Sequence, residues 1–134
     1  MKSERSKLVA RIDKNFSIYI RYRDSVDGMC KCITCPSRLA PKELHAGHFI
    51  SRGCSLTRWD ERNVHAQCAG CNTYRGGEQA KYLIALEDKY GREVVDELME
   101  LERRWRAGEK SFGIGELREL DAKYKQLAKE YSTR

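Results

Sequence analysis

The 134-residue sequence lacks any apolar run near the roughly 20 residues that a membrane-spanning helix requires. Its N-terminus, Met1-Lys2-Ser3-Glu4-Arg5, is charged and has no apolar stretch of the kind found in signal peptides. Low-complexity tracts and repeats of longer period are also missing. These absences predict a protein without a membrane partner that stays in the cytoplasm, where thiols remain reduced.

Charged residues make up 34% of the chain and hydrophobic residues 40%, which indicates one domain with a modest core. A small core favours a bound metal as an additional source of stability. The net charge of +6 is uneven: +3 over residues 1–29, +4 over 30–77 and −1 over 78–134. The basic surplus suits a face that contacts phosphates, although many proteins without a nucleic-acid partner match it.

Residues 5–24 predict an amphipathic helix, because apolar side chains recur there at steps of three and four: Leu8, Ile12, Phe16, Tyr19 and Ile20. The basic residues lie mostly off this stripe and suit either a solvated face or a DNA contact: Arg5, Arg11, Lys14 and Arg21. We therefore assign residues 1–29 to an N-terminal basic amphipathic helix.

The middle of the chain, residues 30–90, predicts short strands followed by a helix. Leu44–Ile50 and Val64–Gln67 are strand candidates that would pair with each other across a loop. A helix should begin after Cys68, and Gly76-Gly77 should interrupt it, since two glycines cost about 2 kcal/mol relative to alanine in a helix. The helical pattern then resumes over 78–90 and ends at Gly91.

Two further helices are predicted over residues 92–107 and 115–131. Their apolar residues repeat at steps of three and four for only about two heptads each, short of a convincing coiled coil. We interpret residues 91–134 as a helical hairpin, either folded within the chain or serving as a dimerisation arm.

Two Cys-x-x-Cys motifs, Cys32/Cys35 and Cys68/Cys71, enclose 32 residues. Each motif delivers two of the four tetrahedral ligands that zinc requires, and in a reducing compartment such pairs indicate metal or redox chemistry rather than disulfides. We predict a structural zinc site. The alternatives are a redox dithiol, disfavoured because no βαβ unit is evident, and incidental buried cysteines. Cys30 and Cys54 lack the spacing, although Cys30 competes with Cys32 as a ligand.

Three sequence blocks lie between and beside these cysteines: Ala46-Gly47-His48-Phe49-Ile50-Ser51-Arg52, Arg58-Trp59-Asp60-Glu61-Arg62-Asn63-Val64-His65, and Cys68-x-x-Cys71-Asn72 through Gln79. They resemble the HNH superfamily of nucleases and, within it, the phage NinG/Rap family of recombination endonucleases. The resemblance covers roughly residues 10–100. It implies an α+β, mostly helical fold with a ββα-metal (HNH) core, here stabilised by the four-cysteine zinc site.

The resemblance also implies roles for three residues. His48 would activate water, Asn63 would brace the loop, and Asn72 would bind a catalytic Mg²⁺ or Mn²⁺ ion. These roles fit the chemistry, since a neutral imidazole can accept a proton near neutral pH and an amide oxygen is a hard ligand.

One position departs from the superfamily pattern, because Gly47 stands where an acidic metal ligand usually precedes the general base. His45 points to the same side of a strand as Gly47, and a bulge there would bring it to the metal. We therefore predict His45 as the second ligand of the catalytic ion, with Asp60, His65 or Glu78 as substitutes. A histidine ligand would favour a softer ion such as Mn²⁺, Zn²⁺ or Ni²⁺.

The arginines of the motif are the predicted phosphate contacts, because a guanidinium matches two phosphoryl oxygens: Arg52, Arg58, Arg62 and Arg75. Trp59 and Tyr74 suit stacking on an unpaired base. For Trp59, filling the small core is the favoured interpretation.

The resemblance implies a metal-dependent DNA endonuclease acting on branched DNA or recombination intermediates such as Holliday junctions, in the host cytoplasm if a phage encodes it. We expect a homodimer, because one such centre breaks one strand per encounter. Two other interpretations stay open: a zinc-stabilised DNA- or protein-binding module without cleavage activity, and a redox sensor. The set His48, Asn63 and Asn72 favours the nuclease.

Overall fold

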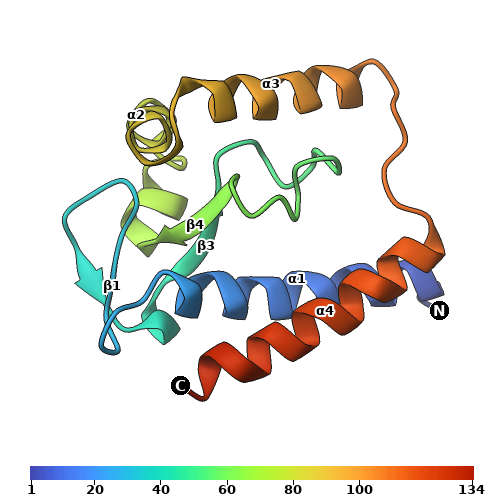
Figure 1. Cartoon of the computed structure of the whole chain (residues 1–134), viewed down its shortest axis with the longest axis horizontal. Helices are drawn as coiled ribbons and strands as arrows, with labels where there is room; N and C mark the ends of the chain where they lie inside the picture. Colours follow the sequence, from blue (N-terminus) through green and yellow to red (C-terminus); the bar gives the residue numbers. More distant parts are fainter.

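The computed structural model describes residues 1–134 and has a mostly helical α+β fold (Figure 1). Its elements are, in chain order, α1 (Glu4–Arg23), β1 (Cys30–Lys31), β2 (Arg38–Leu39), η1 (Pro41–Glu43), β3 (His45–His48), β4 (Val64–Gln67), η2 (Gly70–Tyr74), α2 (Gln79–Tyr90), α3 (Arg92–Arg106) and α4 (Ile114–Ser132). None of these helices is both long enough and apolar enough to cross a membrane.

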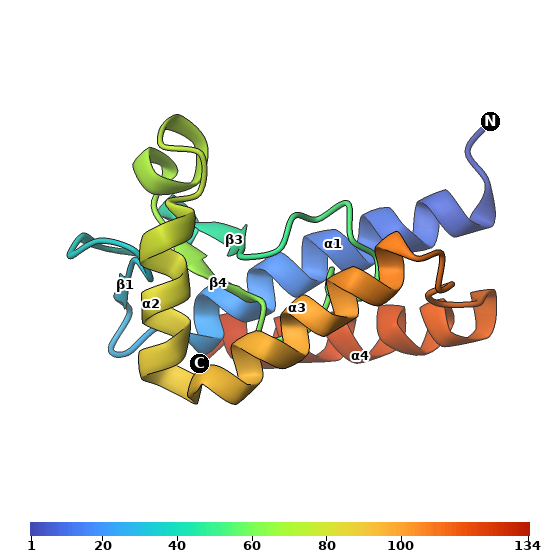
Figure 2. The same ribbon diagram turned by 90° about the horizontal axis from the view of Figure 1, so that it is seen from above.

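Helix α1 forms the base of the molecule together with α4, which lies along it (Figures 1 and 2). Ser3 caps α1, because its hydroxyl accepts a hydrogen bond from the Ser6 N–H at 3.1 Å. The predicted apolar stripe is buried against α4, where the rings of Phe16 and Tyr124 meet edge to face with centroids 4.8 Å apart. The periodicity therefore gave both the helix and its buried face correctly.

The predicted C-terminal helical hairpin is wrong. Helices α3 and α4 lie on opposite sides of the molecule, and the segment 107–113 carries the chain from one to the other (Figure 1). The apolar side of α3, with Val95 and Leu98, packs with α2 and with Ile50. The apolar side of α4 instead joins the α1 core. Each helix has the predicted stripe, but the stripe alone does not specify the element that covers it.

Two small antiparallel hairpins complete the fold, β1 with β2 and β3 with β4. The pairing of β3 with β4 confirms the predicted strand pair. Its register runs without interruption from His45 opposite Gln67 to His48 opposite Val64, so the bulge predicted at Gly47 is absent. After β4 the chain makes the helical turn η2, breaks at Gly76 and Gly77, which have φ of +61° and +90°, and resumes as α2.

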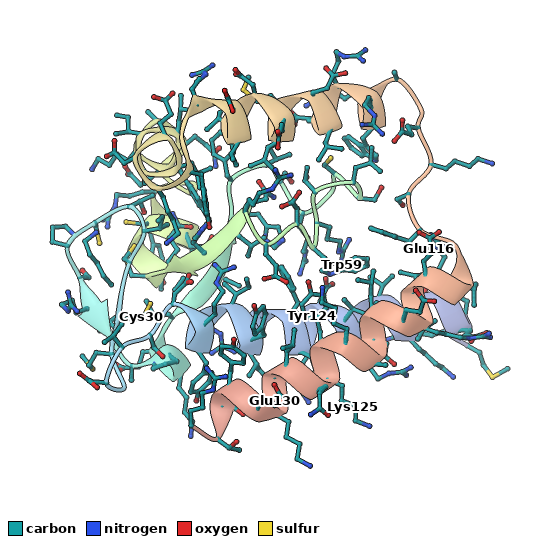
Figure 3. The ribbon with its side chains drawn as sticks, in the orientation of Figure 1. Cys30, Trp59, Glu116, Tyr124, Lys125 and Glu130 are labelled. Atoms are coloured by element: carbon teal, nitrogen blue, oxygen red, sulfur yellow. The ribbon has the colours of Figure 1, made fainter.

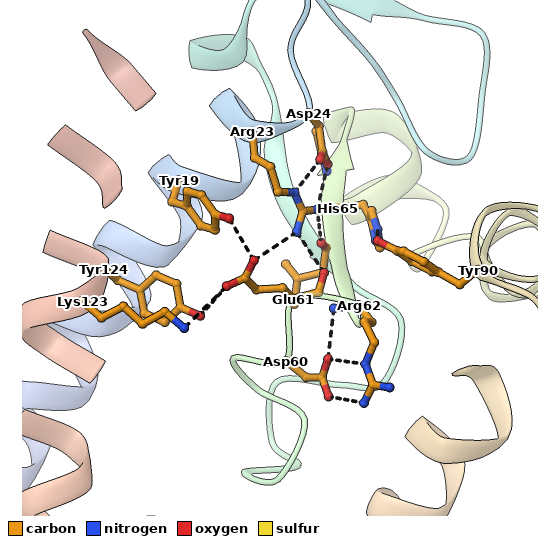
Figure 4. Close-up of polar contacts among 12 residues, drawn as sticks. Tyr19, Arg23, Asp24, Asp60, Glu61, Arg62, His65, Tyr90, Lys123 and Tyr124 are labelled. Atoms are coloured by element: carbon orange, nitrogen blue, oxygen red, sulfur yellow. Dashed lines mark hydrogen bonds and ion pairs between the residues drawn. The ribbon is translucent and has the colours of Figure 1, made fainter. Parts of the chain in front are cut away.

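A polar network ties the base helices to the loop before β4 (Figure 4). Glu61 accepts hydrogen bonds from the hydroxyls of Tyr19 and Tyr124, each at 2.9 Å. Arg23 donates to the carbonyls of Glu61 and Val64, each at 3.0 Å. Since these groups are largely shielded from water, their pairing fixes where the 60–64 segment lies on α1 and α4.

Candidate functional site

The four cysteines of the two motifs converge: the Sγ atoms of Cys32, Cys35, Cys68 and Cys71 all lie within 4.8 Å of one another. The sulfurs of Cys35 and Cys68 are 3.7 Å apart. In a tetrahedral zinc site with bonds of about 2.3 Å, neighbouring sulfurs lie about 3.8 Å apart. The cluster can therefore hold a structural metal ion, and zinc fits its donor set.

Hydrogen bonds around the cluster suit thiolate sulfurs. The backbone N–H of Cys68 donates to Cys32 Sγ at 3.3 Å, and that of Cys71 donates to Cys68 Sγ at 3.4 Å. Arg75 donates from Nη2 to Cys71 Sγ at 3.3 Å. Cys30 and Cys54 are buried outside this group, so Cys30 does not replace Cys32.

Asn63 is fully buried and fastens the loop that joins the two long strands. Its Oδ1 accepts from the Ile50 N–H at 2.8 Å, while its Nδ2 donates to the carbonyls of Ile50 at 3.0 Å and Thr57 at 3.1 Å. An amide is suited to this task because it both donates and accepts. The structure thus places Asn63 where it braces the 50–63 loop, as predicted.

The His48 imidazole stands at the end of β3 with one nitrogen occupied. Its Nε2 lies 2.9 Å from the Arg58 carbonyl oxygen. A carbonyl only accepts, so Nε2 carries the proton and Nδ1 has a free lone pair. Burial lowers the pKa of His48 below its ordinary value. The ring is therefore neutral near pH 7 and can accept a proton at Nδ1.

Asn72 shares a depression of about 460 Å³ with His48, Arg52 and Gly77. Its side-chain nitrogen lies 2.9 Å from Nδ1 of the exposed His45. The two ends of the Asn72 amide have nearly the same shape. Rotating the amide by half a turn would place its Oδ1, in place of Nδ2, beside His45 Nδ1. Two adjacent ligands of an octahedral ion with bonds of about 2.0–2.1 Å lie about 2.9 Å apart. With its amide rotated, Asn72 could thus hold one divalent cation together with His45, although His45 is not among the residues that line the depression with His48.

The family model described as "Bacteriophage Lambda NinG protein" matches residues 1–133. The chain belongs to the NinG family. It is 32% identical over 127 residues to Protein ninG of Escherichia phage 933W, which covers 94% of this chain and 59% of that protein. The lambda and Salmonella phage P22 proteins of the same name are 30% and 29% identical, each over 94% of this chain and 58% of the relative.

The chain of this NinG-family member thus spans less than two thirds of the length of these relatives. No solved structure matches it. The predicted membership of the NinG family is confirmed.

Gly47 is required by close packing in the NinG-family chain. A Cβ added there would lie 2.0 Å from Gln67 Oε1, a buried oxygen without a hydrogen-bond partner. The Gln67 amide is held by donating from Nε2 to Thr34 Oγ1 at 2.9 Å and to the Gly77 carbonyl at 2.8 Å. Gln67 therefore occupies the space that an acidic residue at position 47 would need. Gln67 belongs to no motif, so nothing in the sequence marks it as a neighbour of Gly47.

We expect Gly47→Ala to lower the free energy of unfolding by about 1–3 kcal/mol, because the added methyl group overlaps the Gln67 amide. Urea unfolding of both single variants and of Gly47→Ala/Gln67→Ala measures the coupling. The double variant should recover most of the Gly47→Ala loss. An equal loss from Gly47→Ala with and without Gln67 would contradict this packing explanation.

His65 is a structural histidine and does not serve as a substitute metal ligand. The Tyr82 hydroxyl donates to the Gly47 carbonyl at 2.6 Å, so His65 Nδ1 donates to the Tyr82 oxygen at 3.3 Å. The Tyr90 hydroxyl then donates to His65 Nε2 at 2.8 Å. Burial lowers the pKa of His65 to about 4, which keeps the ring neutral.

This shift predicts a loss of stability in acid. In the unfolded chain His65 binds a proton below its ordinary pKa of about 6.5. In the folded chain it stays neutral until the pH falls to about 4. As the pH is lowered over that range, His65 should therefore reduce the free energy of unfolding by about 3 kcal/mol. Denaturant unfolding at both ends of the range should show a smaller loss in His65→Gln than in the wild type. Equal losses would mean that His65 titrates normally.

Three of the four predicted phosphate-contacting arginines have side-chain partners within the protein, and Arg52 does not. Arg58 pairs with Asp13, and Arg62 pairs with Asp60 and Glu97, so both are already neutralised. Arg75 contacts Cys71 Sγ. Arg52 is exposed, has no ion pair and lines the depression with His48. The local sequence could not reveal the pair of Arg58, because Asp13 lies 45 residues away.

The two aromatic residues of the motif also differ. Trp59 is buried over the α1–α4 pair, where it packs with Phe112, and its Nε1 donates to Asp13 Oδ1 at 2.9 Å (Figure 3). It therefore fills the core. Tyr74 is 83% exposed and remains the aromatic side chain available to a partner. The proposed substitutes Asp60 and Glu78 are occupied by ion pairs with Arg62, Arg75 and Lys81.

Proposed function

We propose that this chain is an HNH-type, metal-dependent DNA endonuclease of the NinG/Rap kind. The observation that carries the proposal is the neutral His48 with a free Nδ1 in the same depression as Asn72. Support comes from the β3–β4 hairpin followed by η2 and α2, which has the order of elements expected of a ββα core. A module that only binds DNA has no need of a proton acceptor beside a cation ligand.

His48 is the proposed general base. Its Nε2–H is held by the Arg58 carbonyl, so Nδ1 takes the proton of a water that attacks the scissile phosphate. Asn63 acts indirectly, because it holds the loop that carries Arg58. Arg52 lies at the same depression and orients the phosphate through its guanidinium.

Asn72 and His45 are the residues that would hold the catalytic Mg²⁺ or Mn²⁺ ion. When bound, such an ion neutralises charge on the phosphate and on the leaving oxygen. The chain contributes its fixed ligands: Asn72 on η2 and His45 on β3 are held close together by the β3–β4 hairpin and the neighbouring cysteine cluster.

Zinc is the proposed ion of the four-cysteine cluster. It would join β1 and the turn after it to the end of β4 and to η2, one residue before Asn72. The metal would thus stabilise the fold and set the position of the cation ligand. The close approach of the sulfurs and the absence of a βαβ unit favour this over a redox dithiol.

Branched DNA is the proposed substrate. Cleavage of two of its strands would require two such centres, so we also propose a homodimer. The face of α4 with the heptad-like spacing is buried against α1, so a dimer would use another surface. These properties belong to the whole protein and rest on the family resemblance.

We expect Arg52→Ala to weaken DNA binding and to reduce the slope of log affinity against log salt concentration by about one, since it removes one phosphate contact. Arg62→Ala is the matched control, because Arg62 is paired with Asp60 and Glu97. Fluorescence anisotropy without added Mg²⁺ or Mn²⁺ measures both. A control variant that weakens binding as strongly as Arg52→Ala would contradict this assignment.

Cleavage of a panel of DNA structures tests the proposed function. Linear duplex, single strand, flap, Y and four-way junctions are incubated with the protein and Mg²⁺ or Mn²⁺ at one fixed salt concentration. We expect branched substrates to be cut preferentially, and His48→Ala to cut them about 10²–10⁴-fold more slowly. Binding without cleavage of any substrate would support the zinc-stabilised binding module instead.

A further inference from the structure

Asp13 lies on α1, outside the depression, yet it clamps two consecutive residues of the motif loop. Its carboxylate accepts from Arg58 Nε at 3.0 Å and Nη2 at 2.5 Å, and from Trp59 Nε1 at 2.9 Å. Bidentate pairs of this kind are stronger and more directional than single contacts. The Asp13 side chain is 22% exposed, which limits screening by solvent.

The clamp acts on the peptide group that orients His48. The carbonyl that receives the His48 Nε2–H belongs to the peptide bond between Arg58 and Trp59. Because a peptide group is planar, its carbonyl can change direction only if the flanking dihedral angles rotate. Asp13 holds the side chains on both sides of this peptide, so it restricts that rotation.

Few other side-chain hydrogen bonds reach residues 57 to 59 of this loop. Residues 51–62 contain no helix or strand and consist of successive turns. Asn63 fixes the Thr57 carbonyl, and a 3.5 Å contact links Arg58 Nη1 to the Arg52 carbonyl. The bonds to Asp13 therefore act together with the core packing of Trp59 against Phe112 in restraining residues 58 and 59.

We propose that Asp13 is a positioning residue for His48: by clamping the Arg58–Trp59 peptide, it keeps the imidazole in the Nε2–H tautomer with Nδ1 free. The catalytic consequence rests on the proposed nuclease function, whereas the tautomer is a property of the chain alone. The Asp13 charge also makes Nδ1 a stronger proton acceptor, since it opposes the lowering of the His48 pKa by burial and by Arg52.

Asp13→Asn in the metal-loaded full chain tests the inference, because it removes the charge and keeps the shape. Nitrogen-15 NMR of the imidazoles at about pH 8, where histidine is neutral, reports the tautomers. His48 should be mainly the Nε2–H form in the wild type and a mixture in Asp13→Asn. His65 is an internal reference, because its contacts require the Nδ1–H form.

Asp121→Asn is the matched control. Asp121 accepts hydrogen bonds from Nε and Nη2 of Arg11, a residue of α1, but this pair joins α1 to α4. The control should keep the wild-type His48 tautomer. Trp59→Phe removes the indole bond to Asp13 and leaves the bidentate Arg58 pair, so it should give a smaller shift than Asp13→Asn and keeps the inference testable if Asp13→Asn folds poorly. A wild-type tautomer in both Asp13→Asn and Trp59→Phe would overturn it.

Cleavage kinetics separate this inference from the proposed function. Asp13→Asn should lower kcat between about 10- and 100-fold, as loss of an orienting partner typically does, with KM unchanged. A changed tautomer in a protein that cleaves no DNA would refute the nuclease and leave the clamp standing. A changed tautomer with undiminished kcat would overturn the positioning role.

Discussion

Replacing Cys68 by serine is expected to abolish the cooperative unfolding transition of this protein. The cluster joins three segments: the Cys32–Cys35 turn, the end of β4 and η2. Binding of zinc to such sites contributes on the order of 10 kcal/mol of folding free energy, comparable with the whole stability of a small domain. Thermal unfolding followed by circular dichroism, together with the zinc content per chain, measures the effect.

Cys54→Ala is the matched control for this substitution. Cys54 is also a buried cysteine, but it packs with Ile50 and Tyr82 and lies outside the cluster. We expect Cys54→Ala to keep about one zinc per chain and a cooperative transition, while Cys68→Ser loses both. If the two variants unfold alike and keep the same metal content, the cluster has no structural role.

The second large effect is expected from His48→Ala, which should reduce the rate of DNA cleavage by about 10²–10⁴-fold, the usual contribution of a general base. Because the His48 ring is only partly buried and makes one hydrogen bond, the variant should remain folded. Single-turnover cleavage at saturating Mg²⁺ or Mn²⁺ gives the rate directly.

Asn72→Ala distinguishes the base from the cation ligand. Loss of a ligand should raise the cation concentration needed for half-maximal activity, so added Mn²⁺ should partly restore cleavage in Asn72→Ala. Added Mn²⁺ should not restore it in His48→Ala, which lacks the proton acceptor. Equal rescue of both variants, or equal nicking by His48→Ala and the wild type, would contradict the assigned roles.

The sequence was sufficient for several patterns that are local. Hydrophobic periodicity predicted a helix over 5–24 where α1 spans Glu4–Arg23, and one over 92–107 where α3 spans Arg92–Arg106. Matched Cys-x-x-Cys spacing predicted the convergence of four sulfurs. Gly91 was correctly placed as the residue that ends α2, where its φ of +90° suits glycine.

Contacts between distant segments could not be predicted in the same way. An apolar stripe indicates that a helix face is buried but not which element covers it. The sequence therefore allowed α4 to pack on α3 as readily as on α1. Charge alone made Arg58 and Arg62 suitable for phosphate, and only the fold brings Asp13 and Glu97 to them. The close approach of Gln67 to Gly47 likewise depends on the register of β3 with β4.

The proposed nuclease requires a divalent cation between β3 and η2, held by Asn72 and His45. Anomalous diffraction from crystals of the protein soaked in Mn²⁺, recorded at the manganese and zinc absorption edges, tests it directly. We expect a manganese peak beside Asn72 and His45, absent in Asn72→Ala, and a separate zinc peak among the four sulfurs. Zinc at the cysteines with no manganese in the depression, at Mn²⁺ concentrations that saturate DNA cleavage, would contradict it.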